Sequence, residues 1–217
     1  IPVEHPTRIE LKDVTFRYPT SPVDNLSGVS LSLSQGQTLG VVGRTGSGKS
    51  TLLKQLLHEY PTGKGEILIS GVPIGQIELD RLHSWMGYVP QEQILFSKTV
   101  RQNIQFGYDN ATDERILEAI TAAAFQNDLG TLAEGLDTLV GERGVSLSGG
   151  QKQRVSLSRA FISNPDILIL DDALSAVDAR TEAQIIENIR QERAGKTTLI
   201  STHRLSAIEH ADMIVVL

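Results

Sequence analysis

The chain contains no cysteine among its 217 residues. A disulfide framework, a thiolate metal site and a cysteine nucleophile are therefore excluded for this chain. It also lacks an apolar run approaching the roughly 18 residues of a membrane span, and its start, IPVEHPTRIE, lacks the pattern of a signal peptide. We expect the chain itself to be soluble. A segment cut from a membrane protein would show the same absences, so they do not decide whether the parent protein is a membrane protein.

Net charge and composition narrow the class of protein. The formal net charge is -6, and the sequence has no extended patch of interleaved basic and aromatic residues, which argues against a broad nucleic-acid surface but leaves a local basic patch open. We therefore expect no nucleic-acid partner. With 40% hydrophobic and 21% charged residues, the composition is that of an ordinary folded protein. The length suffices for one domain with a substantial core and an inserted subdomain.

Hydrophobic periodicity predicts an α/β fold. Apolar and polar residues alternate in two N-terminal segments, which is typical of half-buried strands, and we expect these two to be antiparallel. They cover residues 9–18 and 29–33. Short apolar runs predict buried strands, most of them of the parallel type. These runs lie at 39–43, 66–70, 166–170, 197–201 and 213–217.

Helical patterns lie between these strands. They cover residues 49–60, 113–124, 148–163 and 181–192. Pro61 closes the first helix, and Thr112 is placed to cap the second. From this order we predict a single domain over 1–217, with a core made of 1–90 and 164–217 and an α-helical subdomain inserted at about 91–163.

The segment GRTGSGKS, residues 43–50, matches the phosphate-binding pattern G-x-x-x-x-G-K-[ST] in full and lies between a predicted buried strand and a predicted helix. Its glycines let backbone N–H groups point at phosphates, and the helix N-terminus adds partial positive charge. Lys49 reaches the β/γ oxygens and Ser50 ligates Mg²⁺. The sequence thus predicts a P-loop NTPase core that takes a nucleotide and Mg²⁺. The nucleotide-binding residues are Gly43, Arg44, Thr45, Gly46, Ser47, Gly48, Lys49, Ser50 and Thr51.

An apolar run, ILIL, leads directly into Asp171 and Asp172. A strand buried on both faces would deliver the first carboxylate beside the phosphate loop, where it can hold Mg²⁺ through water. Aspartates commonly begin loops, so this prediction depends on the phosphate loop elsewhere in the chain. We predict Asp171 as the metal-side acid, together with Ser50.

The motif LSGGQ, Leu147 to Gln151, opens the second helix of the insert. Ser148 can cap this helix, and Gly149 and Gly150 expose the backbone at its N-terminus, which makes a second anion site on one chain. One nucleotide does not need two such sites, whereas two chains paired head to tail would each complete the other's site. Together, SGGQKQR, GRTGSGKST and ILILDD resemble the motifs of the nucleotide-binding domains of ABC proteins, over nearly the whole chain.

This resemblance implies that the nucleotide is ATP and gives roles to four more residues. Tyr18 matches the aromatic residue that stacks on adenine; without the resemblance it would be a core tyrosine. Gln91 matches the glutamine that contacts Mg²⁺ and the attacking water and links the site to the transmembrane partner. Asp178 matches the loop that crosses the dimer interface, and His203 matches the histidine that contacts the γ-phosphate. Taken alone, Gln91 would be a solvated loop amide and His203 a structural histidine.

Two further segments are similar to those of ABC exporters, namely DTLVGERGVSLSGGQKQR at 137–154 and PQEQILFSKTVRQNI at 90–104. The resemblance implies a parent protein with an N-terminal transmembrane domain, in which this chain lies at the cytoplasmic face of the inner membrane. The other implied partner is a second ABC nucleotide-binding domain.

In the ABC family the position of Asp172 is usually a glutamate that acts as general base or orients the attacking water. Aspartate keeps the charge but withdraws it by about 1.5 Å, one C–C bond length, and a misplacement of about 1 Å can cost around 100-fold in rate. We predict a weak Mg-dependent ATPase site that largely keeps its affinity for ATP and Mg²⁺. An aspartate beside an intact LSGGQ resembles the degenerate-site half of the heterodimeric bacterial multidrug exporters, and ILILDDALSAVD in particular resembles the first subunit of the Mdl-type pair.

Two other classes of function stay open. A soluble ABC ATPase of DNA repair or translation is disfavoured by the negative net charge and the exporter-like segments, and apolar helices upstream in the parent gene would decide against it. A regulatory domain that binds ATP with little turnover is motivated by Asp172. A P-loop kinase is disfavoured because LSGGQ has no role there.

Overall fold

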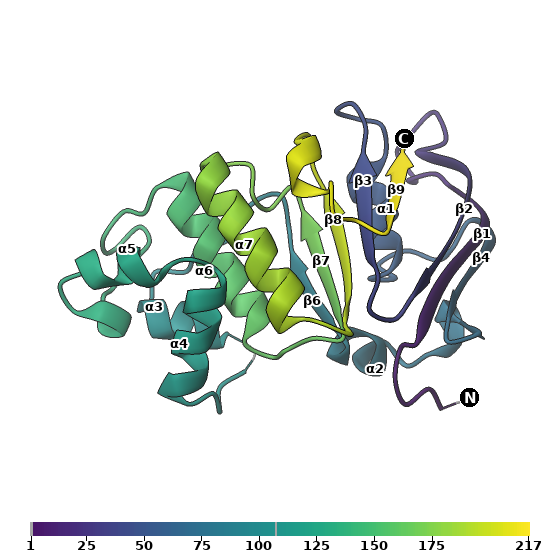
Figure 1. Cartoon of the computed structure of the whole chain (residues 1–217). Coiled ribbons are helices and arrows are strands. Elements are labelled where there is room, and N and C mark those ends of the chain that lie inside the picture. Colours follow the sequence, from purple (N-terminus) through teal and green to yellow (C-terminus); the bar gives the residue numbers. More distant parts are fainter. Residues whose placement is uncertain (1, 107) are drawn as a thin grey trace. The chain divides into compact units, whose positions relative to one another are not determined.

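The computed structural model describes residues 2–106 and 108–217. They form two compact units (Figure 1). The first comprises the chain up to Met86 with residues 165–171 and 195–217, and the second comprises residues 87–164 and 172–194. The sequence-based division, which leaves residues 172–194 in the core, stays a prediction.

An antiparallel sheet with the strand order β2-β1-β4-β5 belongs to the first unit (Figure 1). Its strands are β1 (Arg8–Phe16), β2 (Leu26–Ser34), β4 (Lys64–Ile69) and β5 (Val72–Pro73). β1 pairs with β2 in antiparallel fashion, as the sequence predicts, and Ile9 lies opposite Leu33. Both side chains are buried, because alternate residues of such a sheet face the core.

A parallel sheet forms the other layer of the first unit, with the order β7-β8-β3-β9. Its strands are β3 (Thr38–Val42), β7 (Ile167–Asp171), β8 (Thr197–Ser201) and β9 (Met213–Val216). Every residue of β7 and β8 is buried, which is why these strands are continuous runs of apolar and small residues in the sequence. The strand β6 (Met86–Val89) begins at Met86, where the N-terminal segment of the first unit ends.

Helix α1 (Lys49–Gln55) follows β3 and packs on β7 and β8, and α2 (Leu79–Ser84) lies further along the chain. Short 3-10 turns cover Ile74–Gln76 and Leu205–Ala207. The predicted extension of α1 to residue 60 is wrong. The N–H of His58 donates to the carbonyl of Gln55 at 3.2 Å, and His58 has a φ of 51°. The left-handed residue ends the helix, although Leu56 and Leu57 keep the apolar pattern because they stay buried.

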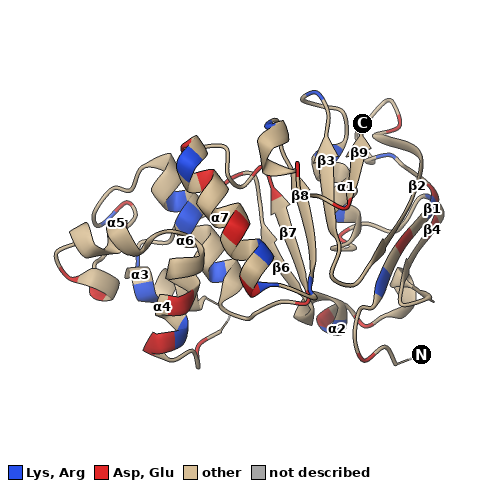
Figure 2. Cartoon of the chain, viewed as in Figure 1, with Lys and Arg blue, Asp and Glu red and all other residues tan. Residues whose placement is uncertain are grey.

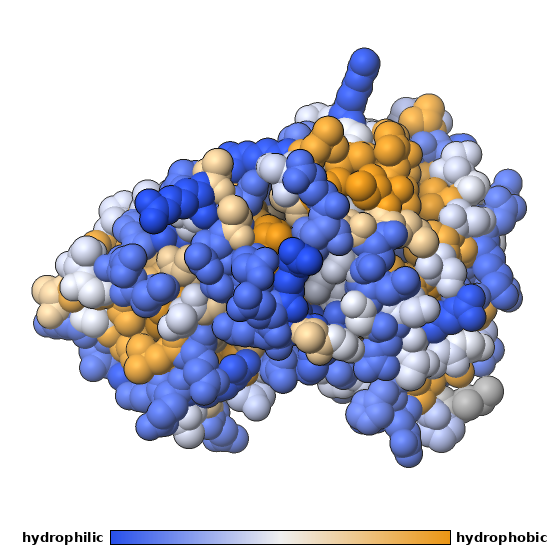
Figure 3. All heavy atoms as spheres, in the orientation of Figure 1, coloured by the Kyte–Doolittle hydropathy of each residue, from blue (hydrophilic) through white to orange (hydrophobic). Residues whose placement is uncertain are grey.

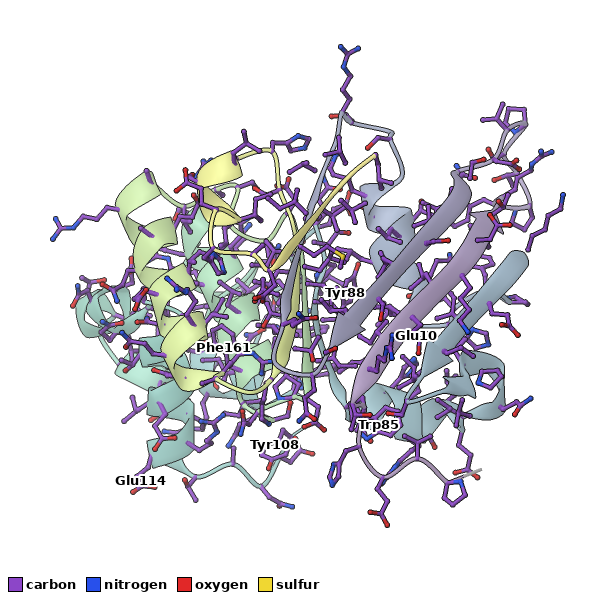
Figure 4. All side chains as sticks on the ribbon, turned by 45° about the vertical axis from the view of Figure 1, so that its right-hand side comes forward. Glu10, Trp85, Tyr88, Tyr108, Glu114 and Phe161 are labelled. Carbon is purple, nitrogen blue, oxygen red and sulfur yellow. The ribbon has the colours of Figure 1, made fainter. Side chains whose placement is uncertain are left out.

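Among its described residues, the second unit consists of helices joined by loops, with residues 87–89 of β6 at its start. Its helices are α3 (Val100–Gln105), α4 (Asp113–Ala122), α5 (Gln126–Thr131), a 3-10 turn at Gly135–Asp137, α6 (Gly149–Phe161) and α7 (Ala179–Glu192). The side chain of Thr112 accepts a hydrogen bond from the N–H of Arg115 at 3.2 Å, which confirms the predicted cap of α4. α4 packs against α6 and α7. Phe161, labelled in Figure 4, is buried among these helices.

The apolar surface of the first unit includes the C-terminal strand. Ile214 and Val216 of β9 are 47% and 75% exposed, and Figure 3 shows an apolar patch over β3 and β9. β9 alternates half-buried and exposed residues, the alternation of a strand with one face toward the core. Within the part of the chain that the structure describes, no helix is long and apolar enough to cross a membrane.

Candidate functional site

The phosphate loop lies between the end of β3 at Val42 and the start of α1 at Lys49. Gly46 and Gly48 have φ angles of 81° and 105°, a region that residues with a side chain rarely adopt. A Cβ on Gly48 would lie 2.5 Å from the carbonyl oxygen of Asn25. The glycines of the motif are therefore required by the backbone, as the sequence predicts.

Inside the loop, the hydroxyl of Ser47 is buried and has no hydrogen-bond partner among the described residues. It lies against Gly43, where an added Cβ would come within 2.4 Å of it. Burying a hydroxyl without a partner is unfavourable, and a phosphate oxygen would supply the missing acceptor. Arg44 and Thr45 are exposed at the loop surface, whereas Thr51 is buried.

The ammonium group of Lys49 is turned back onto the loop. It donates to the carbonyl oxygens of Gly43 at 2.7 Å and of Arg44 at 3.0 Å, and the residue is only 8% exposed. A buried cation that is held by neutral carbonyls has no counter-charge in these contacts. The residues of the loop thus fit an anion with several acceptor oxygens, such as the phosphates of a nucleotide.

Asp171 is 2% exposed at the end of β7. One of its carboxylate oxygens accepts from the hydroxyl of Ser50 at 3.0 Å and from the hydroxyl of Ser201 at 2.9 Å. The structure therefore brings Ser50 and Asp171 together, as predicted. Ser201 was not predicted; it lies opposite Asp171 in the parallel register of β7 and β8, and only that register reveals it.

The cluster offers hard oxygen ligands, which suit Mg²⁺. Ser50 supplies a hydroxyl and Asp171 a buried carboxylate. No group of three or more His, Cys, Asp or Glu side chains in the described residues could hold a metal by itself. Such a sparse protein set is typical of Mg²⁺, which takes its remaining ligands from water and substrate phosphates.

Tyr18 follows β1 and is half-buried. Its ring makes edge-on contacts with Phe16 at 4.9 Å and with Tyr60 at 5.4 Å, measured between ring centroids. The backbone N–H of Tyr18 donates to the side-chain oxygen of Asn25 at 3.0 Å. The ring is thus fixed on two sides. Tyr60 was not predicted as part of the site because it is far from Tyr18 in the sequence.

In the second unit, the signature motif LSGGQ is the first turn of α6. The hydroxyl of Ser148 accepts from the N–H of Gln151 at 3.2 Å, and the side-chain oxygen of Gln151 accepts from the N–H of Ser148 at 2.8 Å. This reciprocal pair is a capping box, so the predicted cap is confirmed. Leu147 is buried, whereas Ser148 and Gly149 are exposed.

Gly150 has a second reason to be glycine besides exposing its backbone. A Cβ at this position would lie 2.8 Å from the carbonyl oxygen of Ala176, whereas a Cβ on Gly149 would meet the Cβ of Ala176 at 3.4 Å. The loop after Asp172 therefore packs directly on the signature turn. Sequence reasoning gave both glycines the same role and missed this difference.

Gln153 fixes that loop and was not predicted. This side chain is 4% exposed, donates to the hydroxyl of Ser175 at 2.9 Å and accepts from the N–H of Ala176 at 2.8 Å. Its amide group also approaches the carbonyl oxygen of Asp172 at 3.5 Å. Asp172 itself has a φ of 50°, a conformation that aspartate tolerates better than most residues.

Asp178 is exposed and caps α7. Its carboxylate accepts from the N–H of Thr181 at 2.9 Å and from the Thr181 hydroxyl at 2.8 Å. These two hydrogen bonds, the backbone one first, lower the pKa of Asp178 below its ordinary value. The role of Asp178 at a dimer interface stays a prediction.

Gln91 and His203 are both exposed. The loop after Gln91 is held by Asn103, whose side-chain oxygen accepts from the N–H of Phe96 at 2.9 Å. Arg159 donates to the carbonyl of Asn103 at 2.7 Å, and burial lowers the pKa of its guanidinium. His203 lies in a turn in which the N–H of Arg204 donates to the hydroxyl of Thr202 at 2.9 Å. The catalytic roles of Gln91 and His203 stay predictions.

A parallel sheet that carries a phosphate loop after one strand and a buried acid after another defines a P-loop nucleotide-binding domain. A sequence model described as "ABC transporter" matches residues 26–175. This chain belongs to the ABC transporter family, and it is an ATP-binding, ATP-hydrolysing domain of that family.

Relatives with known names are longer than this chain. It is 58% identical over 215 residues to the probable multidrug resistance ABC transporter ATP-binding/permease protein YheI of Bacillus subtilis (strain 168), covering 99% of this chain and 37% of the relative. It is 48% identical over 202 residues to the multidrug resistance-like ATP-binding protein MdlA of Escherichia coli (strain K12), covering 93% and 34%. The chain thus spans about a third of the length of these relatives.

The fold is also found in a solved structure, described as a bacterial Atm1-family ABC exporter with ATP bound. The TM-score is 0.94 at 38% sequence identity, and the match covers 100% of this chain and 38% of that one. The predicted α/β class, with antiparallel N-terminal strands beside a parallel core, is confirmed.

Proposed function

We propose that this chain is the motor domain of an exporter half-transporter. In this proposal, ATP hydrolysis with Mg²⁺ drives the export of hydrophobic or multidrug-type substrates through a membrane domain of the same protein. The names of the relatives support it, because YheI is described as a probable multidrug resistance ABC transporter ATP-binding/permease protein and MdlA as a multidrug resistance-like ATP-binding protein. The working protein would be membrane-bound, with this chain at the cytoplasmic face of the inner membrane.

Within the chain, Tyr18 would stack on adenine while the backbone of residues 43–48 wraps the phosphates. Lys49 would exchange its two carbonyl partners for β/γ oxygens. Ser50 and Asp171 would hold Mg²⁺, which would supply positive charge against the charge developing on the phosphate oxygens. Gln91, Asp172 and His203 would position the attacking water and the γ-phosphate.

The signature residues 147–151 would act on the ATP of a second nucleotide-binding domain. Ser148 and Gly149 are exposed at the N-terminus of α6, and a helix N-terminus favours the binding of an anion. A head-to-tail dimer would place each signature turn against the other phosphate loop, with Asp178 at the interface. ATP would close this dimer, and hydrolysis would open it.

One observation carries the finer part of the proposal. The phosphate loop, the metal-side acid and the signature turn are all intact, yet the residue after Asp171 is Asp172 and not the family's glutamate. A shorter acid beside complete binding machinery fits a weak site in a heterodimer. The partner would then carry glutamate, and the signature turn of this chain would complete the strong site.

Affinity purification of the tagged full-length parent from its native membranes tests this arrangement. We expect a second, different ABC chain in equal amount, with glutamate at the position that corresponds to Asp172. Recovery of only a second copy of the same chain would contradict the heterodimer. A parent gene without transmembrane helices upstream of this segment would contradict the exporter and favour a soluble ABC ATPase.

A further inference from the structure

A cluster of three polar side chains lies beside the signature turn in the second unit. The side-chain amide of Gln151 donates to one carboxylate oxygen of Asp128 at 3.0 Å. Arg154 donates to the other carboxylate oxygen of Asp128 at 2.5 Å. Because the side-chain oxygen of Gln151 already accepts from the N–H of Ser148, Gln151 connects Asp128 to the cap of α6.

Arg154 ties the same turn from a second direction. Its Nε donates to the carbonyl of Gly150 at 3.1 Å, and its terminal nitrogen also donates to the carbonyl of Ala124 at 3.0 Å. The guanidinium lies 5.7 Å from the centroid of the Phe125 ring. Asp128 thus holds Gln151 directly and Gly150 through Arg154.

The side chains of Arg154 and Asp128 are 15% and 23% exposed, so their ion pair is shielded from water more than a surface pair. Both line a polar groove of about 670 Å³, which Asp178 and Arg180 also line. Water can therefore reach the cluster if one hydrogen bond is lost. We expect conservative variants of Asp128 to fold for this reason.

We propose that Asp128 is a positioning residue for the signature turn: it fixes the Gln151 side chain and, through Arg154, the Gly150 carbonyl, and so sets the direction of the backbone N–H groups that meet the partner's ATP. This inference rests on the proposed function, in which the signature turn acts in trans. Asp128 comes from α5, a helix that carries none of the motifs that the sequence identifies.

The substitution Asp128→Asn tests the proposal. An amide can accept from Arg154 but then turns its own N–H₂ group toward the N–H₂ group of Gln151, so the second hydrogen bond is lost. Glu187→Gln is the matched control, because Glu187 accepts from Gln191 at 2.7 Å and from Arg190 at 3.5 Å on the exposed face of α7. Figure 2 shows the charged residues of α6 and α7.

Amide hydrogen exchange at Ser148 and Gln151 is the first readout, and it requires no partner. We expect about tenfold faster exchange in Asp128→Asn, the effect of losing one hydrogen bond to a charged group, and no change in Glu187→Gln. The affinity of the phosphate loop for ATP should stay the same in both variants. Unchanged exchange at these two amides in Asp128→Asn overturns the proposal.

Complementation is the second readout, measured in the Asp172→Glu background so that turnover is easily detected. Asp128→Asn should reduce ATPase activity about tenfold. Lys49→Ala should reduce it by at least as much. Mixing the two variant proteins should restore activity above the sum of the separate proteins, because the mixed dimer pairs an intact phosphate loop with an intact signature turn. No recovery on mixing would mean that Asp128 acts on its own chain's ATP, which overturns the trans role.

The two readouts separate this inference from the proposed function. If the specific activity of the Asp172→Glu variant does not depend on protein concentration, the head-to-tail pairing in the proposed function is wrong. Hydrogen exchange at the signature turn still decides whether Asp128 positions it. If the Asp172→Glu variant does pair with a second copy, and Asp128→Asn behaves like Glu187→Gln in both readouts, only the inference about Asp128 is wrong.

Discussion

Single side chains at the phosphate loop are held by short contacts with other groups of the chain. The carboxylate of Asp171 has two hydroxyl donors, Ser50 and Ser201, and the ammonium of Lys49 has two carbonyl acceptors. Lys49 would release its two carbonyls to reach phosphate oxygens, whereas the carboxylate of Asp171, held in advance, needs little rearrangement when charge develops on a substrate. The same holds for Tyr18, whose ring is fixed by two aromatic neighbours.

The contact between Tyr18 and Tyr60 leads to a prediction about base recognition. An aromatic pair contributes about 0.5–1.5 kcal/mol beyond its buried area. Tyr60→Ala should therefore weaken ATP binding about fivefold, while Tyr60→Phe, which keeps the ring, should leave it unchanged. Calorimetric titration with ATP and with inorganic triphosphate, which lacks a base, measures the effect.

The titration with triphosphate is the control for this prediction. Its affinity should not depend on residue 60, because the phosphates contact the loop and not the aromatic pair. Equal losses for ATP and triphosphate in Tyr60→Ala would show that Tyr60 supports the loop as a whole. Unchanged ATP affinity would show that the contact with Tyr18 is irrelevant to binding.

Two helix N-termini in the second unit, those of α6 and α7, carry the elements of the proposed interface. The cap of α6 is the Ser148–Gln151 pair, and the cap of α7 is Asp178. Between them, the loop at 172–177 is fixed by Gln153 and by its close approach to Gly150. The two caps are therefore linked by packing and not only by sequence.

The glycines of the signature turn should respond differently to alanine. Gly150→Ala places a Cβ 2.8 Å from the carbonyl oxygen of Ala176, and such overpacking costs about 1–3 kcal/mol. Gly149→Ala meets only a methyl carbon at 3.4 Å and should leave the free energy of unfolding nearly unchanged. Denaturant unfolding of both variants compares them, and equal stability would contradict the packing described for Gly150.

The cap of α7 should make stability depend on pH. The hydrogen bonds from Thr181 lower the pKa of Asp178 in the folded state. A carboxylate with a lowered folded pKa stabilises the fold above its unfolded pKa of about 3.9, and this stabilisation is lost as the pH falls through the folded value. Asp178→Ala should therefore lower Tm at pH 7, by an amount that shrinks below about pH 4.

Thr112→Ala is the control for this pH dependence. Thr112 caps α4 with a neutral hydroxyl, so the loss of Tm in this variant should not change as its cap titrates. Thermal unfolding of both variants and the wild type at a series of pH values gives the comparison. A constant difference between Asp178→Ala and wild type from pH 7 to pH 3 would contradict the lowered pKa.

Across the whole chain, what could be predicted from the sequence was local. The phosphate loop, the caps of α4 and α6, and the buried strand before Asp171 each follow from neighbouring residues. Ser201, Tyr60 and Asp128 were missed because their contacts depend on pairing between distant segments: the register of β7 with β8, the pairing of β1 with β4, and the approach of α5 to α6. The end of α1 was misplaced because buried leucines continue past it.

The central claim is that this chain is an ABC motor domain in which the length of the acid at position 172 limits turnover. Steady-state MgATP hydrolysis by wild type and by Asp172→Glu, over a range of protein concentration, tests it most directly. Asp172 has a φ of 50°, which glutamate tolerates less well, so the variant should lose up to about 1 kcal/mol of stability. Its thermal unfolding must therefore be measured alongside its activity.

We predict that Asp172→Glu hydrolyses ATP at least about tenfold faster than wild type, since restoring the reach of the acid recovers part of the roughly 100-fold loss expected for its misplacement. The rate should also rise faster than linearly with concentration, because two chains form each site. Brisk turnover by wild type with no gain from glutamate would contradict the account. Asp172 would then be an adequate base, and a homodimer with two working sites would replace the unequal pair.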